Sequence, residues 1–287
     1  MNTKELILNH YKTYPELEVQ DLFKFLYQSS FGCEHLISNP SFILKNIQQE
    51  MQTSKDSLTI YEELDGDYVR LHLNCGLEAT TMAKLFVLSS AKVNDAIPLL
   101  EHKLHILLQC IQEQELPFQL VKVEQAIQKW KKEGYPALHH SKTFNDIYHP
   151  AYRLVKKEYI PFLPIFKYID QRCPSIVSID GRCASGKTTL SSLLSKIYDC
   201  NVFHMDDFFL QPFQRTAKRF NAPGENVDHE RFEAEVLIPL SHHQDINLRK
   251  FDCSTFTIQK PIQMVYKPLN IIEGSYSMHS KLQSYYD

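Results

Sequence analysis

The spacing of hydrophobic residues divides the 287-residue chain into two parts with different periodicities. Up to about residue 170, hydrophobic residues recur at intervals of three and four, the spacing that places them on one face of an α-helix. This pattern predicts helices over residues 17–29, 41–52, 77–90, 97–114 and 121–132. Residues 68–74 alternate hydrophobic and polar side chains instead, and predict a half-buried strand. The first part is therefore expected to be a mainly α-helical domain.

The periodicity changes near residue 171. Pro161 and Pro164 interrupt the last helical pattern, and Pro174 precedes a new series of elements. Short hydrophobic runs typical of buried strands follow at 175–180, 201–204 and 270–273, separated by helical segments. We place the domain boundary here, with a helical domain of unknown role over 1–171 and an α/β domain over 172–287.

Composition excludes several classes of protein. The net charge of -3, with 23% charged residues, gives no basic surface for nucleic acid. Neither an export signal nor a hydrophobic run long enough to span a membrane is recognisable, so no membrane partner is expected. The seven cysteines form no C-x-x-C pair and are odd in number, which indicates a reducing, cytoplasmic setting. Homo-oligomerisation stays open.

Residues 181–188 read Gly-Arg-Cys-Ala-Ser-Gly-Lys-Thr and fit the P-loop (Walker A) pattern G-x-x-x-x-G-K-[ST]. The motif follows a predicted strand and precedes a predicted helix, so its backbone N–H groups and the helix N-terminus would face a phosphate. Lys187 would reach the β- and γ-phosphates of ATP, and the Thr188 hydroxyl would bind Mg²⁺. An ordinary glycine-containing turn is the alternative. The predicted cofactor-binding residues are Gly181, Ala184, Ser185, Gly186, Lys187, Thr188 and Thr189.

Two carboxylates, Asp206 and Asp207, follow the second predicted strand of this domain. In a parallel sheet that end of the strand lies beside the phosphate loop. Transfer of a phosphoryl group to an alcohol needs a carboxylate that deprotonates the hydroxyl and oxygen ligands for Mg²⁺. The alternative is a solvated pair of side chains or a helix N-cap.

Five segments in this order resemble the uridine kinase and phosphoribulokinase family: 181–189, 204–209, 226–232, 251–252 and 271–274. The resemblance implies a P-loop NTPase-type parallel sheet and a kinase that uses ATP and Mg²⁺. By position, Asp206 resembles the general base that also contacts the metal, and Asp228 resembles the carboxylate that binds sugar hydroxyls. Glu273 resembles the acidic residue beside the metal. The implied site comprises Lys187 and Asp206 as catalytic residues, Asp207 and Asp228 at the substrate, and Thr188, Asp206 and Glu273 at the metal.

The chain also departs from this family. Phe251 and Phe256 stand where its nucleoside kinases have a tyrosine and a histidine that hold the base, so uridine itself is not implied. The sequence ends at Asp287, fourteen residues after Glu273, before the family's arginine-rich lid and last strands. We therefore expect a C-terminally incomplete sheet with one flank of the P-loop strand uncovered, and nucleotide binding with slow turnover.

The segment 134–153 is rich in residues that bind ligands: His139, His140, Tyr148, His149, Tyr152 and Arg153. It could bind an anion, a nucleotide or, together with Cys33, Glu34 and His35, a zinc ion. No pairing has a recognised metal spacing, and such side chains also serve as polar-tipped packing. This half is similar to N-terminal regions of bacterial uridine-kinase-like proteins, a likeness that implies no activity.

Taken together, the motifs predict a cytoplasmic, ATP- and Mg²⁺-dependent phosphotransferase of the uridine kinase-like class. Its acceptor would be a hydroxyl of a small nucleoside or sugar-like metabolite. The alternatives are a nucleotide-binding regulatory module and an inactive truncated kinase.

Overall fold

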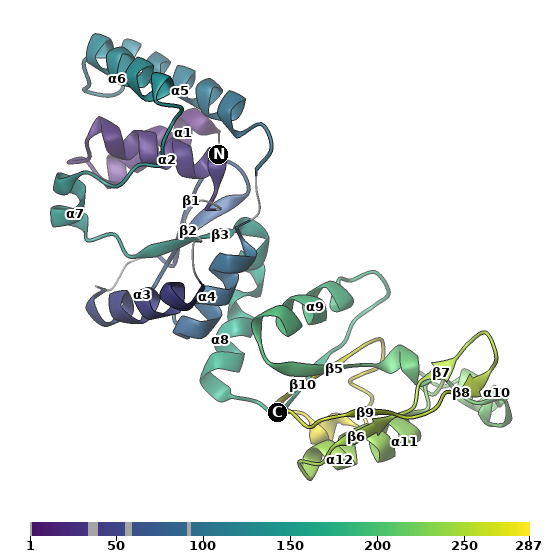
Figure 1. The fold of residues 1–287 in the computed structure, drawn as a ribbon. Coiled ribbons are helices and arrows are strands. Elements are labelled where there is room, and N and C mark those ends of the chain that lie inside the picture. Colours follow the sequence, from purple (N-terminus) through teal and green to yellow (C-terminus); the bar gives the residue numbers. More distant parts are fainter. Residues whose placement is uncertain (1, 34–39, 55–58, 91–92) are drawn as a thin grey trace. The chain divides into compact units, whose positions relative to one another are not determined.

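A computed structural model describes residues 2–33, 40–54, 59–90 and 93–287 (Figure 1). The chain divides into two compact units, Met1–Asp170 (unit 1) and Gln171–Asp287 (unit 2). Together they make a mixed α/β protein, and each unit is described by itself below.

Unit 1 contains the helices that the hydrophobic periodicity predicts. The predicted ranges correspond to α2 (Val19–Phe31), α3 (Pro40–Thr53), α4 (Ala79–Leu88), α5 (Ala96–Gln112) and α6 (Leu120–Lys132), which confirms them. The structure adds α1 (Thr3–Thr13), α7 (Lys142–Tyr148), a 3-10 turn η2 (Lys157–Phe162) and α8 (Leu163–Arg172). Pro161 lies in the 3-10 turn directly before α8 and interrupts the helical pattern as expected. Pro164 instead lies in the first turn of α8, where a helix tolerates proline.

An antiparallel sheet forms the centre of unit 1, with strand order β1 (Tyr61–Glu63), β2 (Tyr68–His72) and β3 (Tyr152–Lys156). Only β2 is predicted from the sequence, because β1 is short and polar and β3 begins at the end of the histidine-rich segment. The sheet lies between the α1 and α2 layer and the α3–α4 pair (Figure 1). The consecutive residues Val69, Arg70 and Leu71 of β2 are all buried. Successive side chains of a strand point to opposite faces, so this burial is expected where helices cover both faces of the sheet.

The contact between α2 and α5 buries several leucine side chains of unit 1. Leu22 and Leu26 of α2 and Leu100 and Leu107 of α5 are fully buried, and α5 packs on α2. Burial of each such side chain contributes about 1.5–3 kcal/mol relative to exposure, so the α2–α5 contact is a main source of stability.

Unit 2 contains a parallel sheet of three strands, in the order β4 (Ile176–Ile179), β10 (Leu269–Glu273) and β5 (Cys200–His204). Helix α9 (Lys187–Ile197) covers one face, and Phe203 and Ile272 lead into a core on the other (Figure 1). The remaining elements of unit 2 are η3 (Met205–Asp207), η4 (Pro212–Gln214), α10 (Ala217–Phe220), α11 (His229–Phe232), the π-helical turn η5 (Glu233–Leu237), α12 (Ile238–Ser241), β6 (Ile246–Leu248), β7 (Phe251–Asp252), β8 (Thr257–Ile258), β9 (Ile262–Met264) and η6 (Gln283–Tyr285).

Strand β4, which precedes the P-loop motif, pairs with β10 along one of its two edges. Asp287 lies against the other edge of β4, at the first residues of the strand. The Asp287 N–H donates to Ile176 O at 3.1 Å, and its carboxylate accepts from the amides of Ser175 and Ile176 at 2.6 and 2.9 Å. Apart from this contact, the flank of β4 is not paired within the described residues.

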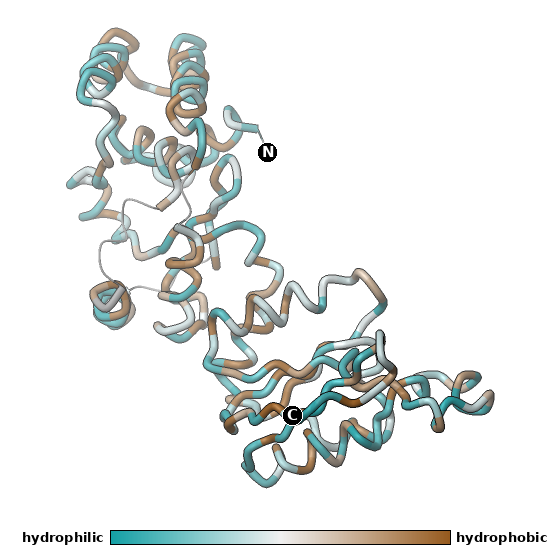
Figure 2. Tube along the Cα trace, turned by 45° about the vertical axis from the view of Figure 1, so that its right-hand side comes forward, coloured by the Kyte–Doolittle hydropathy of each residue, from teal (hydrophilic) through white to brown (hydrophobic). Residues whose placement is uncertain are grey.

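Hydrophobic and hydrophilic residues alternate at short intervals along the helices (Figure 2). Among the described residues, every helix is too short or too polar to cross a bilayer.

Leu100→Ala is expected to lower the free energy of unfolding of unit 1 by about 2–5 kcal/mol, because it leaves a cavity where the side chain is fully buried. Urea titration followed by the fluorescence of Trp130, the single tryptophan, measures the loss. The neighbouring Leu99 is 38% exposed. Leu99→Ala is therefore the matched control, with an expected change within about 0.5 kcal/mol. Equal losses from the two variants would contradict the packing described here.

Candidate functional site

The loop between β4 and α9 adopts a conformation that depends on glycine. Gly181 and Gly186 have φ values of 151° and 87°, and a Cβ added to Gly181 would lie 2.8 Å from Ser185 Oγ. The ammonium of Lys187 donates hydrogen bonds to Gly181 O and Arg182 O, both at 2.9 Å. The loop therefore turns around the Lys187 side chain. Ala184, Ser185 and Thr189 are exposed in this loop and in the first turn of α9.

The N-terminus of α9 offers backbone donors. Within the described part of the chain, the amides of Gly186, Lys187 and Thr188 have no hydrogen-bond acceptor, as expected for the start of a helix. The helix dipole adds partial positive charge at this point, and the Lys187 ammonium adds a full charge. This arrangement can bind an anion such as a phosphate group.

Three side chains meet at the carboxyl ends of the strands. Thr188 Oγ1 donates to Glu273 Oε1 at 3.2 Å, and His204 Nδ1 lies 2.6 Å from the same oxygen. Glu273 and His204 are direct partners in the β10–β5 register, which explains why their side chains meet. The structure thus brings together Thr188 and Glu273, two of the residues for which the sequence predicts a metal role. His204 was given no role from the sequence, although its place at the end of the second predicted strand, two residues before Asp206, marks it.

Asp180 is a second residue that sequence reasoning left without a role. Its carboxylate accepts hydrogen bonds from the amides of Gly181 at 2.5 Å, Tyr276 at 3.1 Å and Met278 at 2.9 Å. These bonds connect the start of the P-loop segment to the chain that follows β10. In the sequence, the one sign of a role for Asp180 is its position between the last residue of the strand and the first glycine of the motif.

Asp206 and Asp207 are neighbours in sequence but differ in whether their carboxylates are free to meet a ligand. Both lie in η3, directly after β5, and Asp206 is exposed, two residues beyond His204. The carboxylate of Asp207 pairs with the Lys250 ammonium at 2.8 Å. Asp206 is therefore accessible to a ligand, whereas Asp207 already has a cationic partner.

Asp228 is 2% exposed and forms the N-cap of α11. Its Oδ1 accepts from the Arg231 amide at 3.2 Å, and Oδ2 lies 3.4 Å from Arg231 Nε. The Arg231 guanidinium in turn donates to Asp207 O at 3.2 Å. The carboxylate that the family resemblance assigns to sugar hydroxyls is thus buried and engaged within the protein.

A histidine and glutamate cluster also lies in unit 2. Ligand atoms of Glu225, His229 and His279 lie within 4.8 Å of one another. The Lys281 ammonium is 3.4 Å from His229 Nε2 and 3.6 Å from Glu225 Oε1. A cation of the protein itself therefore already lies against these side chains.

Comparison with known proteins gives little further information. No protein-family model and no curated protein matches the sequence. Among solved structures, the chain is similar to the "Structure of a Possible Uridine Kinase from Bacillus stearothermophilus", with 23% identity over 43% of this chain and 78% of that chain. The TM-score is 0.35, and at this value we base no inference on the similarity.

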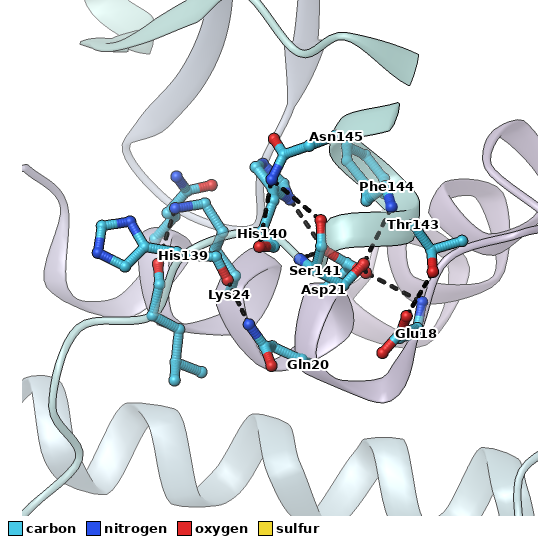
Figure 3. Close-up of polar contacts among 12 residues, drawn as sticks. Glu18, Gln20, Asp21, Lys24, His139, His140, Ser141, Thr143, Phe144 and Asn145 are labelled. Carbon is cyan, nitrogen blue, oxygen red and sulfur yellow. Dashed lines mark hydrogen bonds and ion pairs between the residues drawn. The ribbon is translucent and has the colours of Figure 1, made fainter. Parts of the chain in front are cut away.

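In unit 1, the histidine-rich segment forms a polar cluster with α2 (Figure 3). The Asp21 carboxylate accepts from Ser141 N at 2.9 Å and Ser141 Oγ at 2.6 Å, and lies 3.0 Å from His140 Nδ1. His140 Nε2 is 2.6 Å from the Tyr152 hydroxyl. Both ring nitrogens of His140 are thus engaged by the protein, which favours the packing role over the metal role.

The other residues considered for a zinc site do not gather around His140. The Cys33 thiol is buried, and its sulfur lies 3.9 and 3.8 Å from the acceptors Phe86 O and Leu154 O. Glu34 and His35 lie outside the described residues.

Burial shifts the ionisation of this cluster. Burial alone would raise the pKa of Asp21, but hydrogen bonds from His140 and Ser141 outweigh it and hold the pKa at about 2. Burial lowers the pKa of His140 to about 4, against the opposing effect of Asp21. At neutral pH the folded protein therefore contains ionised Asp21 and neutral His140.

The free energy of unfolding of unit 1 is expected to fall as the pH is lowered from about 6.5 to about 4. In this range unfolded His140 binds a proton while folded His140 does not, so His140 can contribute a loss of up to about 3 kcal/mol. Denaturation followed by Trp130 fluorescence at several pH values measures the slope. His140→Gln should flatten it, and an unchanged slope in that variant would rule out this origin.

Proposed function

We propose that unit 2 is an ATP- and Mg²⁺-dependent phosphotransferase of the uridine kinase-like class, acting on a hydroxyl of a small nucleoside or sugar-like metabolite. The observation that carries the proposal is the hydrogen bond between Thr188 and Glu273 at the start of α9. It joins the Lys-Thr pair of a P-loop motif to an acidic residue at the end of a neighbouring strand, as a nucleotide and metal site requires.

The chemistry of these donors fits the cofactors. The hydroxyl of Thr188 and the carboxylate of Glu273 are oxygen ligands, which Mg²⁺ prefers. The free amides of α9 and the ammonium of Lys187 suit the phosphates of ATP. Bound Mg²⁺ would neutralise charge on the β- and γ-phosphates. His204, against Glu273, would orient that carboxylate.

The acceptor would meet the exposed Asp206 carboxylate. In the proposed reaction Asp206 accepts the proton of the acceptor hydroxyl as that oxygen attacks the γ-phosphorus of ATP; the bond from the γ-phosphorus to the bridging oxygen breaks, and ADP leaves. Lys187 stabilises the negative charge of the transferred group. Asp207, the other carboxylate predicted at the substrate, forms an ion pair with Lys250 at 2.8 Å.

A second candidate function is a nucleotide-binding regulatory module. The burial of Asp228 and its engagement by Arg231 favour it, because a carboxylate in this state does not offer oxygens to an acceptor. Turnover distinguishes the two functions, since both require nucleotide binding.

Lys187→Ala is expected to weaken MgATP binding on the order of 10- to 100-fold, the range for losing a charged hydrogen-bond donor. Titration calorimetry of the full chain measures the dissociation constant. Lys196→Ala is the matched control, because Lys196 is exposed in the last turn of the same helix. Equal affinities for Lys187→Ala and the parent protein would refute a phosphate site at this loop.

Asp206→Asn is expected to lower kcat about 10²- to 10⁴-fold, the usual contribution of a general base. Release of ADP in the presence of a panel of nucleosides and sugars measures turnover. The control is Asp199→Asn, at a carboxylate with 86% side-chain exposure in the same unit. MgATP binding without turnover on any acceptor would instead favour the regulatory module.

A further inference from the structure

A cavity of about 160 Å³ lies in unit 1, next to the polar side chains of β2. Its lining comes from β1, β2, the end of α1 and the segment that leads into β3. Water occupies about 30 Å³ per molecule in the liquid, so the cavity has room for the polar group of a small metabolite.

Arg70 has an unused hydrogen-bond donor at this cavity. The side chain is 1% exposed and lies between the rings of Phe25 and Tyr152, at 5.2 and 4.8 Å from their centroids. Its Nε donates to Gln28 at 2.8 Å and Nη1 donates to Glu62 at 2.9 Å. Nη2 is buried and has no partner among the described residues. A buried donor without an acceptor is rare and destabilising, which points to a missing acceptor.

His72 supplies a second unused nitrogen. It lies two residues beyond Arg70 on β2, so both side chains project from the same face of the sheet. Both line the cavity, and His72 Nε2 is likewise buried without a partner in the described part of the chain. The tautomer with hydrogen on Nε2 donates into the same space.

Glu62, the acidic residue that lines the cavity, does not supply the acceptor that Arg70 Nη2 lacks. Glu62 Oε2 accepts from Arg70 Nη1, and Glu62 Oε1 lies 2.5 Å from His10 Nδ1. Each oxygen therefore already has a nitrogen partner. The Tyr148 hydroxyl, also on the lining, accepts from the Glu16 amide at 2.9 Å and keeps its own hydrogen for a further acceptor.

We propose that this cavity binds an oxyanion, the carboxylate or phosphate group of a small metabolite, through Arg70 Nη2, His72 Nε2 and the Tyr148 hydroxyl. An oxyanion offers several acceptor oxygens in one compact group, and its bonds to a guanidinium are charge-assisted. The aromatic rings of Tyr14 and Tyr152 line the same cavity and would contact the rest of the ligand. The site is independent of phosphotransfer in unit 2.

Inorganic phosphate and acetate, titrated separately into the full chain, test the proposal and distinguish the two sources of oxyanion. The chain carries Lys187→Ala and Thr188→Ala, so that phosphate does not bind at the P-loop segment. Chloride keeps the ionic strength constant, and titration calorimetry measures affinity. Saturable binding of one probe is expected.

Variants locate the binding. His72→Leu should weaken it about tenfold, and Arg70→Gln on the order of 100-fold, the range for losing a charged hydrogen bond. His72→Gln keeps a donor and should retain most of the affinity. Arg153→Gln is the control, because Arg153 pairs with Glu50 at 2.7 Å and lines a neighbouring pocket, not this cavity. Trp130 fluorescence checks that each variant is folded.

Each outcome decides the proposal. Binding that is lost in His72→Leu and kept in His72→Gln and Arg153→Gln supports it. Absence of saturable binding of either probe overturns it, and the cavity then holds water alone. Binding that persists unchanged in folded His72→Leu and Arg70→Gln also overturns it, since the anion would then bind elsewhere.

Discussion

Backbone pairing of β10 with both β4 and β5 determines where the polar groups of unit 2 lie. All five residues of β10 are buried, and its register sets Glu273 beside His204 and next to Ile179. Because the three strands are parallel, their carboxyl ends meet at one edge, where the loop before α9 also begins. Thr188 reaches Glu273 for this reason. The candidate nucleotide site therefore depends on the sheet more than on any single side chain.

Unit 1 depends on a different constraint: the charged side chains in its interior need hydrogen-bond partners. Arg70, Lys103 and Asp21 are all buried, and a buried charge is tolerated only with hydrogen-bond partners. Lys103 has such partners in the Ser29 carbonyl and the Asp65 carbonyl, at 3.1 and 2.8 Å. Asp21 has them in the His140–Ser141 segment. Arg70 is the exception, because one of its donors has no acceptor among the described residues, and the proposed oxyanion site rests on this imbalance.

Carboxylates show why residue type alone does not assign a role. The same acceptor oxygens cap a helix, neutralise an arginine or bind a substrate hydroxyl. Asp228 looks like a substrate ligand by resemblance, yet its place at the start of α11 makes it an N-cap. Asp180, unremarked in the sequence, connects two loops through three backbone amides. Which chain segment packs nearby decides between these roles.

The sequence by itself determined helices α2 to α6 of unit 1, the strands of the parallel sheet and the loop before α9, because periodicity and glycine spacing act locally. Only the tertiary structure revealed β1, which is three residues long and too short to show an alternation, and β3, which pairs with β2 from far along the chain. It alone placed His204 against Glu273 and left Arg70 Nη2 without an acceptor. These features arise from contacts between distant segments, which no local pattern encodes.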